Sequence, residues 1–165
     1  MKKIVLLLLL TITFSSCEKD DICAEETTPR LVLEFYDISN PSNLKNVLNL
    51  KIKGIGATED LGTFNGVSKI VLPLDITQDS TKYSLILNST SLTLNNEDSL
   101  QFNYTRQNVF VSRACGYKTI FELNPTPTGV INTDAATPDG FWIQDINIVT
   151  TNIETENETH IKIYF

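Results

Sequence analysis

Apolar and polar side chains alternate along most of the chain after residue 30. Leu31, Leu33 and Phe35 occupy every second position, and residues 48–53 and 83–88 show the same period. A period of two is typical of β-strands, because successive side chains point to opposite faces of a sheet. The same pattern predicts further strands over 69–74, 110–113, 117–123, 143–151 and 160–165, with 124–140 as one long loop.

One β-hairpin is predicted near the middle of the chain. Leu92 and Leu94 alternate with polar residues, as do Leu100 and Phe102, and Asn95-Asn96-Glu97-Asp98 separates the two runs. Four turn-forming residues between two alternating runs are typical of a hairpin loop. We therefore expect residues 95–98 to be that loop.

The chain is predicted to be all-β, because no helical period continues for ten residues. Short strands separated by turn residues favour an antiparallel β-sandwich of about 8–10 strands, of Greek-key, immunoglobulin-like type. A closed β-barrel is the alternative that the pattern leaves open.

The first hydrophobic run is different in kind. Ile4 to Leu10 is unbroken and follows Lys2 and Lys3. It is too short for a membrane-spanning helix, which needs about 20 residues. A basic start followed by a short apolar run is typical of a cleaved export signal, so we expect residues 1–16 to be removed.

The end of this segment resembles the lipobox of bacterial lipoproteins. Ser15 and Ser16 precede Cys17, although Phe14 stands where leucine is usual. The resemblance implies a diacylglyceryl thioether on Cys17 and an acyl chain such as palmitate on the new amino group. Two or more acyl chains hold a protein stably on a membrane. An ordinary secretory signal with an incidental cysteine is the alternative.

Lys19, Asp20 and Asp21 follow this cysteine closely. A lysine and two acidic residues at this place resemble the surface-export signal of Bacteroidota lipoproteins, which implies the outer leaflet of the outer membrane. The alternative is a charged tether on the periplasmic face. We expect residues 17–30 to form a lipidated flexible tether and residues 31–165 a single domain.

Charge argues against one class of partner. The full sequence has a formal net charge of −7, and cleavage would remove Lys2 and Lys3 but no acid. An acidic chain repels phosphate backbones, and no basic stripe with interleaved aromatic residues occurs. Nucleic acid is therefore excluded as an expected partner.

Two cysteines remain once lipid takes Cys17. Cys23 and Cys115 form an even pair in an exported protein, so a disulfide is predicted. In the chain-entropy model, closing such a long loop stabilises the fold by about 4–5 kcal/mol. Cys115 as a nucleophile is disfavoured, because no histidine lies near it in the sequence.

Candidate catalytic and metal-binding residues are few. His160 is the only histidine, and its alternation with Ile161 and Ile163 predicts a solvent-facing position. Asp134, Asp139 and Asp145 could gather calcium, but turn-forming roles are the favoured interpretation. We assign no catalytic residue, metal or cofactor.

Phe141 and Trp142 are the candidates for ligand binding. They follow the turn Pro138-Asp139-Gly140. Aromatic side chains often contact sugars or proteins, although a core position is the alternative for Trp142.

Four segments together resemble a family of uncharacterised flavobacterial lipoproteins. They are Leu31–Asp37 with the preceding Cys23, Phe102–Arg106, Val111–Lys118 and Glu156–Phe165. The resemblance covers nearly all of the chain after the signal and supports the pairing of Cys23 with Cys115. It carries no catalytic residues, because the family is a domain of unknown function.

These features predict a non-enzymatic, membrane-anchored lipoprotein of the cell envelope. Its domain is expected to serve as a binding or assembly module of the outer membrane or cell surface. An outer-membrane protein or an envelope polymer is the expected partner, besides the membrane that holds Cys17. The alternative is a surface glycan-binding or glycan-processing module, which needs a concave pocket near Trp142.

Overall fold

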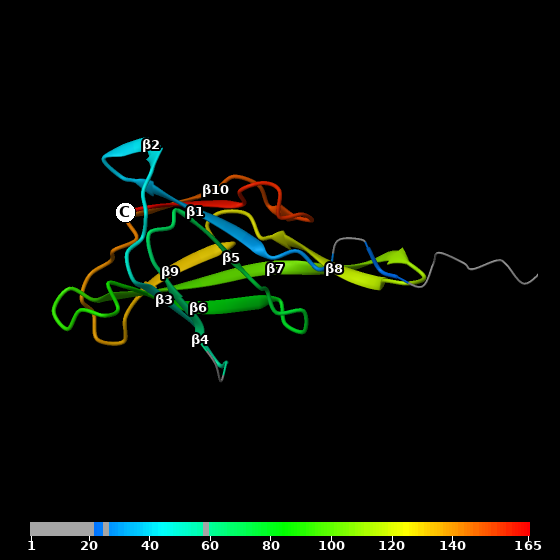
Figure 1. Cartoon of the computed structure of the whole chain (residues 1–165), viewed down its shortest axis with the longest axis horizontal. Helices are drawn as coiled ribbons and strands as arrows, with labels where there is room; N and C mark the ends of the chain where they lie inside the picture. Colours follow the sequence, from blue (N-terminus) through cyan, green and yellow to red (C-terminus); the bar gives the residue numbers. More distant parts are fainter. Residues whose placement is uncertain (1–21, 25–26, 58–59) are drawn as a thin grey trace, which may run out of the picture.

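The computed structural model describes residues 22–24, 27–57 and 60–165, and it forms two β-sheets in this part of the chain. The predicted signal peptide, the lipidation site Cys17 and the export residues Lys19, Asp20 and Asp21 lie outside the described residues. Twelve strands occur in the described part, and the two sheets form the layers seen in Figure 1.

The first sheet is built around the apolar strand that opens the domain. It contains β1 (Leu31–Asp37), β2 (Asn40–Leu44), β5 (Lys69–Leu72), β10 (Asp145–Ile148) and β12 (Ile161–Tyr164). One edge of β1 pairs with β12, and its other edge pairs with β5 and β2. The β1–β12 pair is parallel, with Leu33 opposite Ile161 and Phe35 opposite Ile163. The expected antiparallel sandwich is therefore mixed in this layer.

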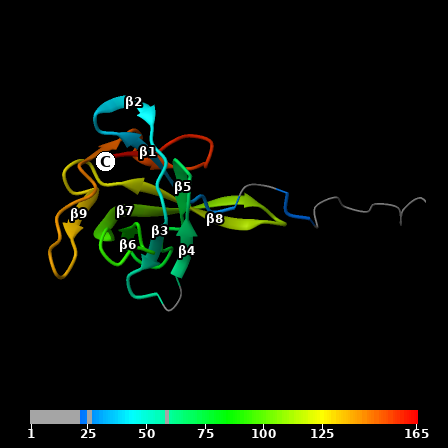
Figure 2. The same cartoon turned by 60° about the vertical axis from the view of Figure 1, so that its left-hand side comes forward.

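The second sheet is larger and is centred on one long strand. It contains β3 (Leu50–Gly54), β4 (Asp60–Phe64), β6 (Ser80–Leu87), β7 (Asn96–Ser112), β8 (Gly116–Leu123), β9 (Val130–Asp134) and β11 (Asn152–Ile153). The order is β11-β8-β7-β6-β3-β4, and β9 pairs with β7 as well. The turned view in Figure 2 shows β3 and β4 in the lower part of the molecule, below β1 and β2 of the first sheet.

Strand β7 has 17 residues and serves two parts of the sheet. Its first half pairs with β6 and with β9, and its second half pairs with β8. The prediction of a hairpin loop at residues 95–98 is therefore wrong, because β7 begins at Asn96. Leu92 and Leu94 lie in the connection between β6 and β7, where they are 98% and 70% exposed. Their alternation with polar residues is typical of a strand, but neither side chain packs into the core.

The sequence pattern does not predict four strands, of which β11 has only two residues. β9 lies inside residues 124–140, which the composition predicts to be one loop. β2 and most of β4 are exposed, so they have no buried face to produce an apolar alternation. Backbone pairing with a neighbouring strand, rather than burial, stabilises such segments.

The core lies between the two sheets and confirms the β-sandwich. Leu31, Leu33, Phe35 and Ile163 from the first sheet are fully buried, as is Phe102 from the second. The sheets do not close on one another, so the barrel alternative is wrong. Within the described residues, no helix of the length and apolarity required to cross a membrane is found.

Candidate functional site

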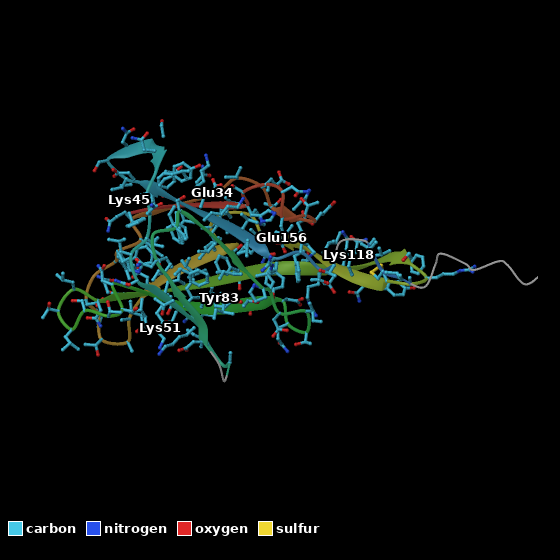
Figure 3. All side chains as sticks on the ribbon, in the orientation of Figure 1. Glu34, Lys45, Lys51, Tyr83, Lys118 and Glu156 are labelled. Atoms are coloured by element: carbon cyan, nitrogen blue, oxygen red, sulfur yellow. A yellow bond between two sulfur atoms is a disulfide. The ribbon has the colours of Figure 1, made fainter. Side chains whose placement is uncertain are left out.

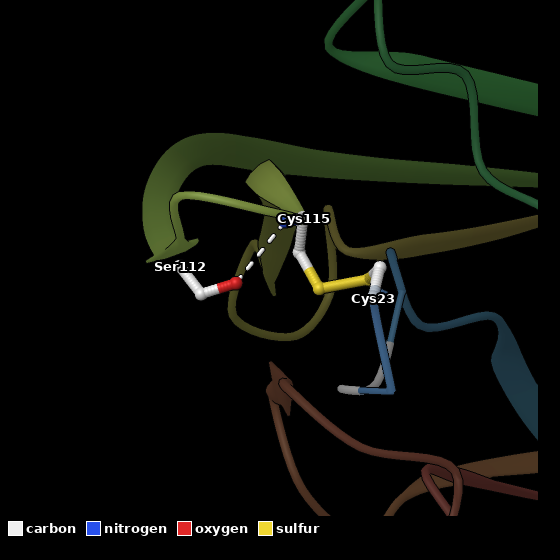
Figure 4. Close-up of a disulfide and its surroundings, with 3 residues drawn as sticks. All are labelled: Cys23, Ser112 and Cys115. Carbon is white, nitrogen blue, oxygen red and sulfur yellow. Dashed lines mark hydrogen bonds between the residues drawn. A yellow bond between two sulfur atoms is a disulfide. The ribbon is translucent and has the colours of Figure 1, made fainter. Parts of the chain in front are cut away.

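The predicted disulfide between Cys23 and Cys115 is confirmed. The two Cα atoms are 4.8 Å apart, and the bond joins residues separated by 92 positions. Cys115 lies in the turn between β7 and β8, where its backbone N–H donates to Ser112 Oγ at 3.1 Å (Figure 4). The bond therefore fastens the N-terminal segment to the tip of the β7–β8 hairpin.

Further contacts fasten the chain between the disulfide and β1. Thr28 Oγ1 accepts a hydrogen bond from the backbone N–H of Thr119 on β8. The Arg30 guanidinium donates to both carboxylate oxygens of Glu156, at 2.8 and 2.7 Å. Cys23, Thr28 and Arg30 lie within the stretch 17–30 that the sequence predicts to be flexible, and each of them contacts the domain.

A cleft of about 520 Å³ opens beside β3, β4 and β6. Tyr83 of β6, which is labelled in Figure 3, lines it together with the β5–β6 connection. The remaining lining residues are Gly54, Ile55, Gly56, Ala57, Leu61, Pro73, Leu74, Asp75, Thr81 and Lys82. Most of this wall is apolar or backbone, which favours binding of a small apolar or mixed ligand.

Two titratable groups in the cleft have pKa values that are shifted further from neutral pH. Hydrogen bonds from the Thr77 hydroxyl and backbone N–H to Asp75 lower the pKa of that carboxyl below its ordinary value. Burial raises the pKa of Tyr83 to about 12, and its hydroxyl donates to the Pro73 carbonyl. General acid–base catalysis at neutral pH favours groups that titrate near 7, and neither of these does.

A second candidate site lies at the end of the molecule opposite the disulfide. The connections before β3, after β6 and before β10 meet there, at the left of Figure 1. They expose Leu48, Leu92, Leu94 and Phe141. We call these connections the distal loops.

Hydrogen bonds order the distal loops. The Ser89 hydroxyl donates to the Asn49 carbonyl at 2.7 Å, and Asn96 Nδ2 donates to the Gly140 carbonyl at 2.6 Å. Asn49 and Asn88 adopt left-handed backbone conformations with φ of 46° and 51°, which asparagine tolerates better than most residues. The exposed leucines are therefore presented by turns that are hydrogen-bonded to one another.

The two candidate aromatic residues have different environments. Phe141 is half-exposed in the distal loops, whereas Trp142 is only 7% exposed. Trp142 packs against Phe35 and Phe165, and its Nε1–H donates to the Leu85 carbonyl at 3.1 Å. The indole is thus a core group with its one donor satisfied, and it offers little surface to a ligand.

The prediction that His160 faces solvent is wrong, because the side chain is fully buried. His160 Nδ1 accepts the backbone N–H of Val32 at 2.8 Å, and its own backbone N–H donates to the Val32 carbonyl. His160 precedes β12, so its imidazole takes the place of a backbone acceptor for β1. Burial lowers the pKa of His160, which fits a neutral ring with the proton on Nε2.

The aspartates weighed for calcium form turns and strands. Asp134 accepts hydrogen bonds from the backbone N–H groups of Ala135, Asp139 and Gly140, and Asp145 pairs with Tyr164 in the sheet. Burial raises the pKa of Asp134, but these backbone donors outweigh it and leave the pKa below its ordinary value. Within the described residues, no group of three histidine, cysteine or acidic side chains could hold a metal.

Asp98 is a buried carboxylate that the sequence pattern misses. It follows Asn96 on the inward face of β7, and its Oδ2 accepts the backbone N–H of Ile143 at 2.7 Å. Its Oδ1 has no hydrogen-bond partner among the described residues. Burial raises the pKa of Asp98 to about 6, although the Ile143 N–H opposes this, and the charges of Asp134 and Asp139 add to the rise.

Comparison with known proteins adds one assignment. Residues 49–165 match the family of unknown function DUF6452. The chain belongs to this family. The DUF6452 range includes β3 to β12 and Cys115, whereas Cys23, β1 and β2 lie before it. No curated protein and no solved structure matches the chain.

The exposed leucines of the distal loops are the candidate residues that sequence reasoning missed. The spacing of Leu92 and Leu94, taken alone, predicts a strand. The preceding run Asn88-Ser89-Thr90-Ser91 is rich in turn-forming residues, and this signal favours a loop.

Proposed function

We propose that this member of DUF6452 is a non-enzymatic lipoprotein of the cell envelope. In this proposal, acyl chains on Cys17 hold it on the outer membrane of a flavobacterium, and Lys19, Asp20 and Asp21 direct it to the cell surface. The domain acts as a binding module that contacts another envelope component. The family itself carries no known function, so the proposal depends on the residues of this chain.

One feature supports the anchor, and a second supports export. The sequence around Cys17 resembles a lipobox, and the remaining cysteines form a disulfide. Disulfides persist in exported proteins and are rare in reducing compartments. A disulfide at Cys23 is therefore consistent with export of the chain.

The observation that carries the binding role is the set of exposed leucines on ordered distal loops. Leu92 and Leu94 are largely exposed, although the Ser91 hydroxyl accepts the backbone N–H groups of Thr93 and Leu94. Exposed apolar side chains on a rigid scaffold are typical of protein–protein contacts. The distal loops also lie at the end opposite the disulfide, so a membrane anchor leaves them accessible. The proposed partner is an envelope protein, such as one of the outer membrane.

Site-specific photo-crosslinking in cells tests this role. A photoreactive residue at Leu92 is expected to give one discrete adduct with another envelope protein. The matched control is Ile76, an exposed apolar residue in the β5–β6 connection. Adducts of equal yield at Leu92 and Ile76, or repeated absence of any adduct at Leu92 and Leu94, would contradict the proposal.

The absence of catalysis is proposed from the chemistry of the cleft. Asp75 is held ionised and Tyr83 is held neutral, so neither exchanges protons readily near neutral pH. His160, the general base that a Ser-His-acid triad needs, is buried against Val32.

A surface glycan-binding module is the second candidate. The cleft that could serve it lies beside Tyr83 and does not include Trp142, where the sequence predicts the pocket. Its volume of about 520 Å³ is that of a small-ligand site. Leu61→Lys adds a long charged chain to the cleft wall and is expected to abolish binding of envelope oligosaccharides in calorimetric titration. Leu44→Lys, on the exposed strand β2, is the control. No binding by the unmutated protein would exclude this function.

A further inference from the structure

We propose that the tip of the β7–β8 hairpin docks into the membrane interface, with the rings of Phe110 and Tyr117 among the lipid headgroups. The inference rests on the proposed lipid anchor at Cys17. It adds a second, non-covalent contact with the membrane, and this contact fixes the orientation of the domain.

The hairpin tip exposes an aromatic pair that the core does not use. Phe110 and Tyr117 face each other across the two strands and are 56% and 71% exposed. Their ring centroids are 5.4 Å apart at an interplanar angle of 69°, which is an edge-to-face pair. The hairpin extends beyond the rest of the sandwich in Figure 1, so the rings can meet a flat surface before the domain does. Tyrosine is enriched at membrane–water interfaces, where its ring is apolar and its hydroxyl stays hydrated.

The disulfide brings this pair close to the proposed anchor. Six residue steps separate Cys17 from Cys23, and an extended chain covers at most about 20 Å in that distance. Cys23 is bonded to Cys115, two residues from Tyr117, which adds about 7 Å along the strand. The lipid on Cys17 therefore limits the aromatic pair to a short distance from the bilayer.

Two basic residues lie near the aromatic pair. Arg113 is exposed in the turn, and Lys118 follows Tyr117 on β8 (Figure 3). Among the residues that the structure describes, neither forms an ion pair. Glu18, Asp20 and Asp21 lie between Cys17 and Cys23, so this end of the chain has no net positive charge, and the two cations act only as local partners for lipid phosphates beside the aromatic pair. A lipid surface is thus the occupant that this tip fits.

Tryptophan fluorescence of the full lipidated protein in vesicles tests the docking. The vesicles contain phosphatidylethanolamine and a minority of phosphatidylglycerol, with or without bromine at shallow acyl positions. Phe110→Trp is expected to lose several-fold more of its emission to brominated lipid than the matched control Phe141→Trp. Phe141 is also half-exposed, but it lies in the distal loops. Unmutated protein gives the background of the buried Trp142.

The outcomes separate docking from anchoring. Equal quenching of the two tryptophan variants, in protein that sediments with the vesicles, overturns docking and leaves the anchor in place. Shielding of Phe110→Trp from iodide without quenching by brominated lipid indicates a protein occupant and also overturns docking. Protein that does not sediment with the vesicles overturns the anchor and the docking together.

A paired substitution provides a second readout. Phe110→Ser with Tyr117→Ser removes both rings at exposed positions, so the fold is expected to be retained. On vesicles, amide hydrogen exchange in residues 110–117 is expected to be several-fold faster in this variant than in the unmutated protein. Identical exchange in the two proteins, with the anchor intact, overturns docking.

Discussion

At the scale of single residues, two buried titratable groups make the stability of the domain depend on pH. Asp98 and His160 are both fully buried, and each binds a backbone N–H of another segment. Burial disfavours the charged form of each group, so it raises the pKa of the acid and lowers that of the histidine. Their effects on folding therefore have opposite signs.

Asp98 is expected to destabilise the fold as the pH rises from about 4 to about 6. Its pKa is about 4 when unfolded and about 6 when folded, so in this window the folded state binds more protons. A difference of two pKa units corresponds to at most about 3 kcal/mol. Asp98→Asn is expected to flatten this dependence and to raise stability at pH 7.

Urea unfolding across this pH range measures the effect of Asp98→Asn. The substituted side chain keeps a carbonyl oxygen for the Ile143 N–H and places an amide nitrogen where Oδ1 of the aspartate has no partner. Asp145→Asn, at an exposed position on β10, is the control. If stability depends on pH in the same way in Asp98→Asn and in the unmutated protein, Asp98 is not the source of this pH dependence.

His160 is expected to have the opposite effect. Its pKa is lower in the folded state, so below about pH 6.5 the unfolded chain binds the proton more readily and stability falls as the pH falls. His160→Asn keeps an acceptor for Val32 without titrating and is expected to remove this loss. His160→Ala leaves the buried Val32 N–H unpaired and is expected to cost about 1–3 kcal/mol at every pH. Equal stability of the alanine variant and the unmutated protein at pH 7 would exclude the proposed hydrogen bond.

At the scale of elements, the sequence predicts the strands that have one buried face. The alternation of Leu31, Leu33 and Phe35 predicts β1 correctly, because the inner face of a sandwich imposes that period. The parallel pairing of β1 with β12 could not be predicted, since it depends on a contact between residues more than 120 positions apart. The prediction for His160 fails for a related reason. Alternation fixes a direction only inside a strand, and His160 lies one residue before β12.

The candidate site was less predictable than the fold. Trp142 is a core residue because Leu85, Phe35 and Phe165 contact it. These neighbours are distant in the sequence, so no local pattern distinguishes a core tryptophan from a binding one. The disulfide was predictable because export and an even number of cysteines leave a single pairing. Its location at a hairpin tip could not be predicted, because it depends on the length of β7. The spacing of Leu92 and Leu94 predicts a loop at residues 95–98, where β7 in fact begins.

The β7–β8 hairpin and the N-terminal segment are expected to be held together less stably when the disulfide is removed, although the hydrogen bond between Thr28 and Thr119 remains. Cys23→Ser with Cys115→Ser is expected to cost about 4–5 kcal/mol in the chain-entropy model, because the bond closes a loop of 92 residues. Chemical denaturation should give the same midpoint for this variant and for the reduced unmutated protein. Ser112→Ala, which removes only the hydrogen bond from Cys115 N–H, is the control. An unchanged midpoint after reduction would show that the bond does not stabilise the fold.

At the scale of the whole molecule, the two ends have different proposed roles. The hairpin tip and the distal loops lie at opposite ends of the sandwich (Figure 1), and in the proposed arrangement the tip faces the membrane and the distal loops face away from it. Protease treatment can show on which side of the outer membrane the domain lies, because a protease outside the cell digests the domain only if the domain is also outside.

Protease treatment of intact cells is expected to digest the domain. Substitution of Asp20 and Asp21 by alanine removes the acidic part of the proposed export signal and is expected to protect the protein until the cells are lysed. A periplasmic protein that stays intact is the control for membrane integrity. Digestion of the unmutated protein only after lysis would place it on the periplasmic face instead.

The length of β7 sets the distance between the two ends of the sandwich. The strand runs from the distal loops to the disulfide-bonded tip, and its 17 residues make 16 steps of about 3.4 Å, which span about 54 Å. With the tip docked as proposed, this span is the greatest height above the bilayer at which the strand can hold the distal loops, and a tilted domain holds them lower. Inserting two residues into each of β7 and β8 keeps every side chain on its own face and extends the reach by about 7 Å. In the proposed arrangement, the length of the β7–β8 hairpin therefore sets the distance from the membrane at which the distal loops meet a partner.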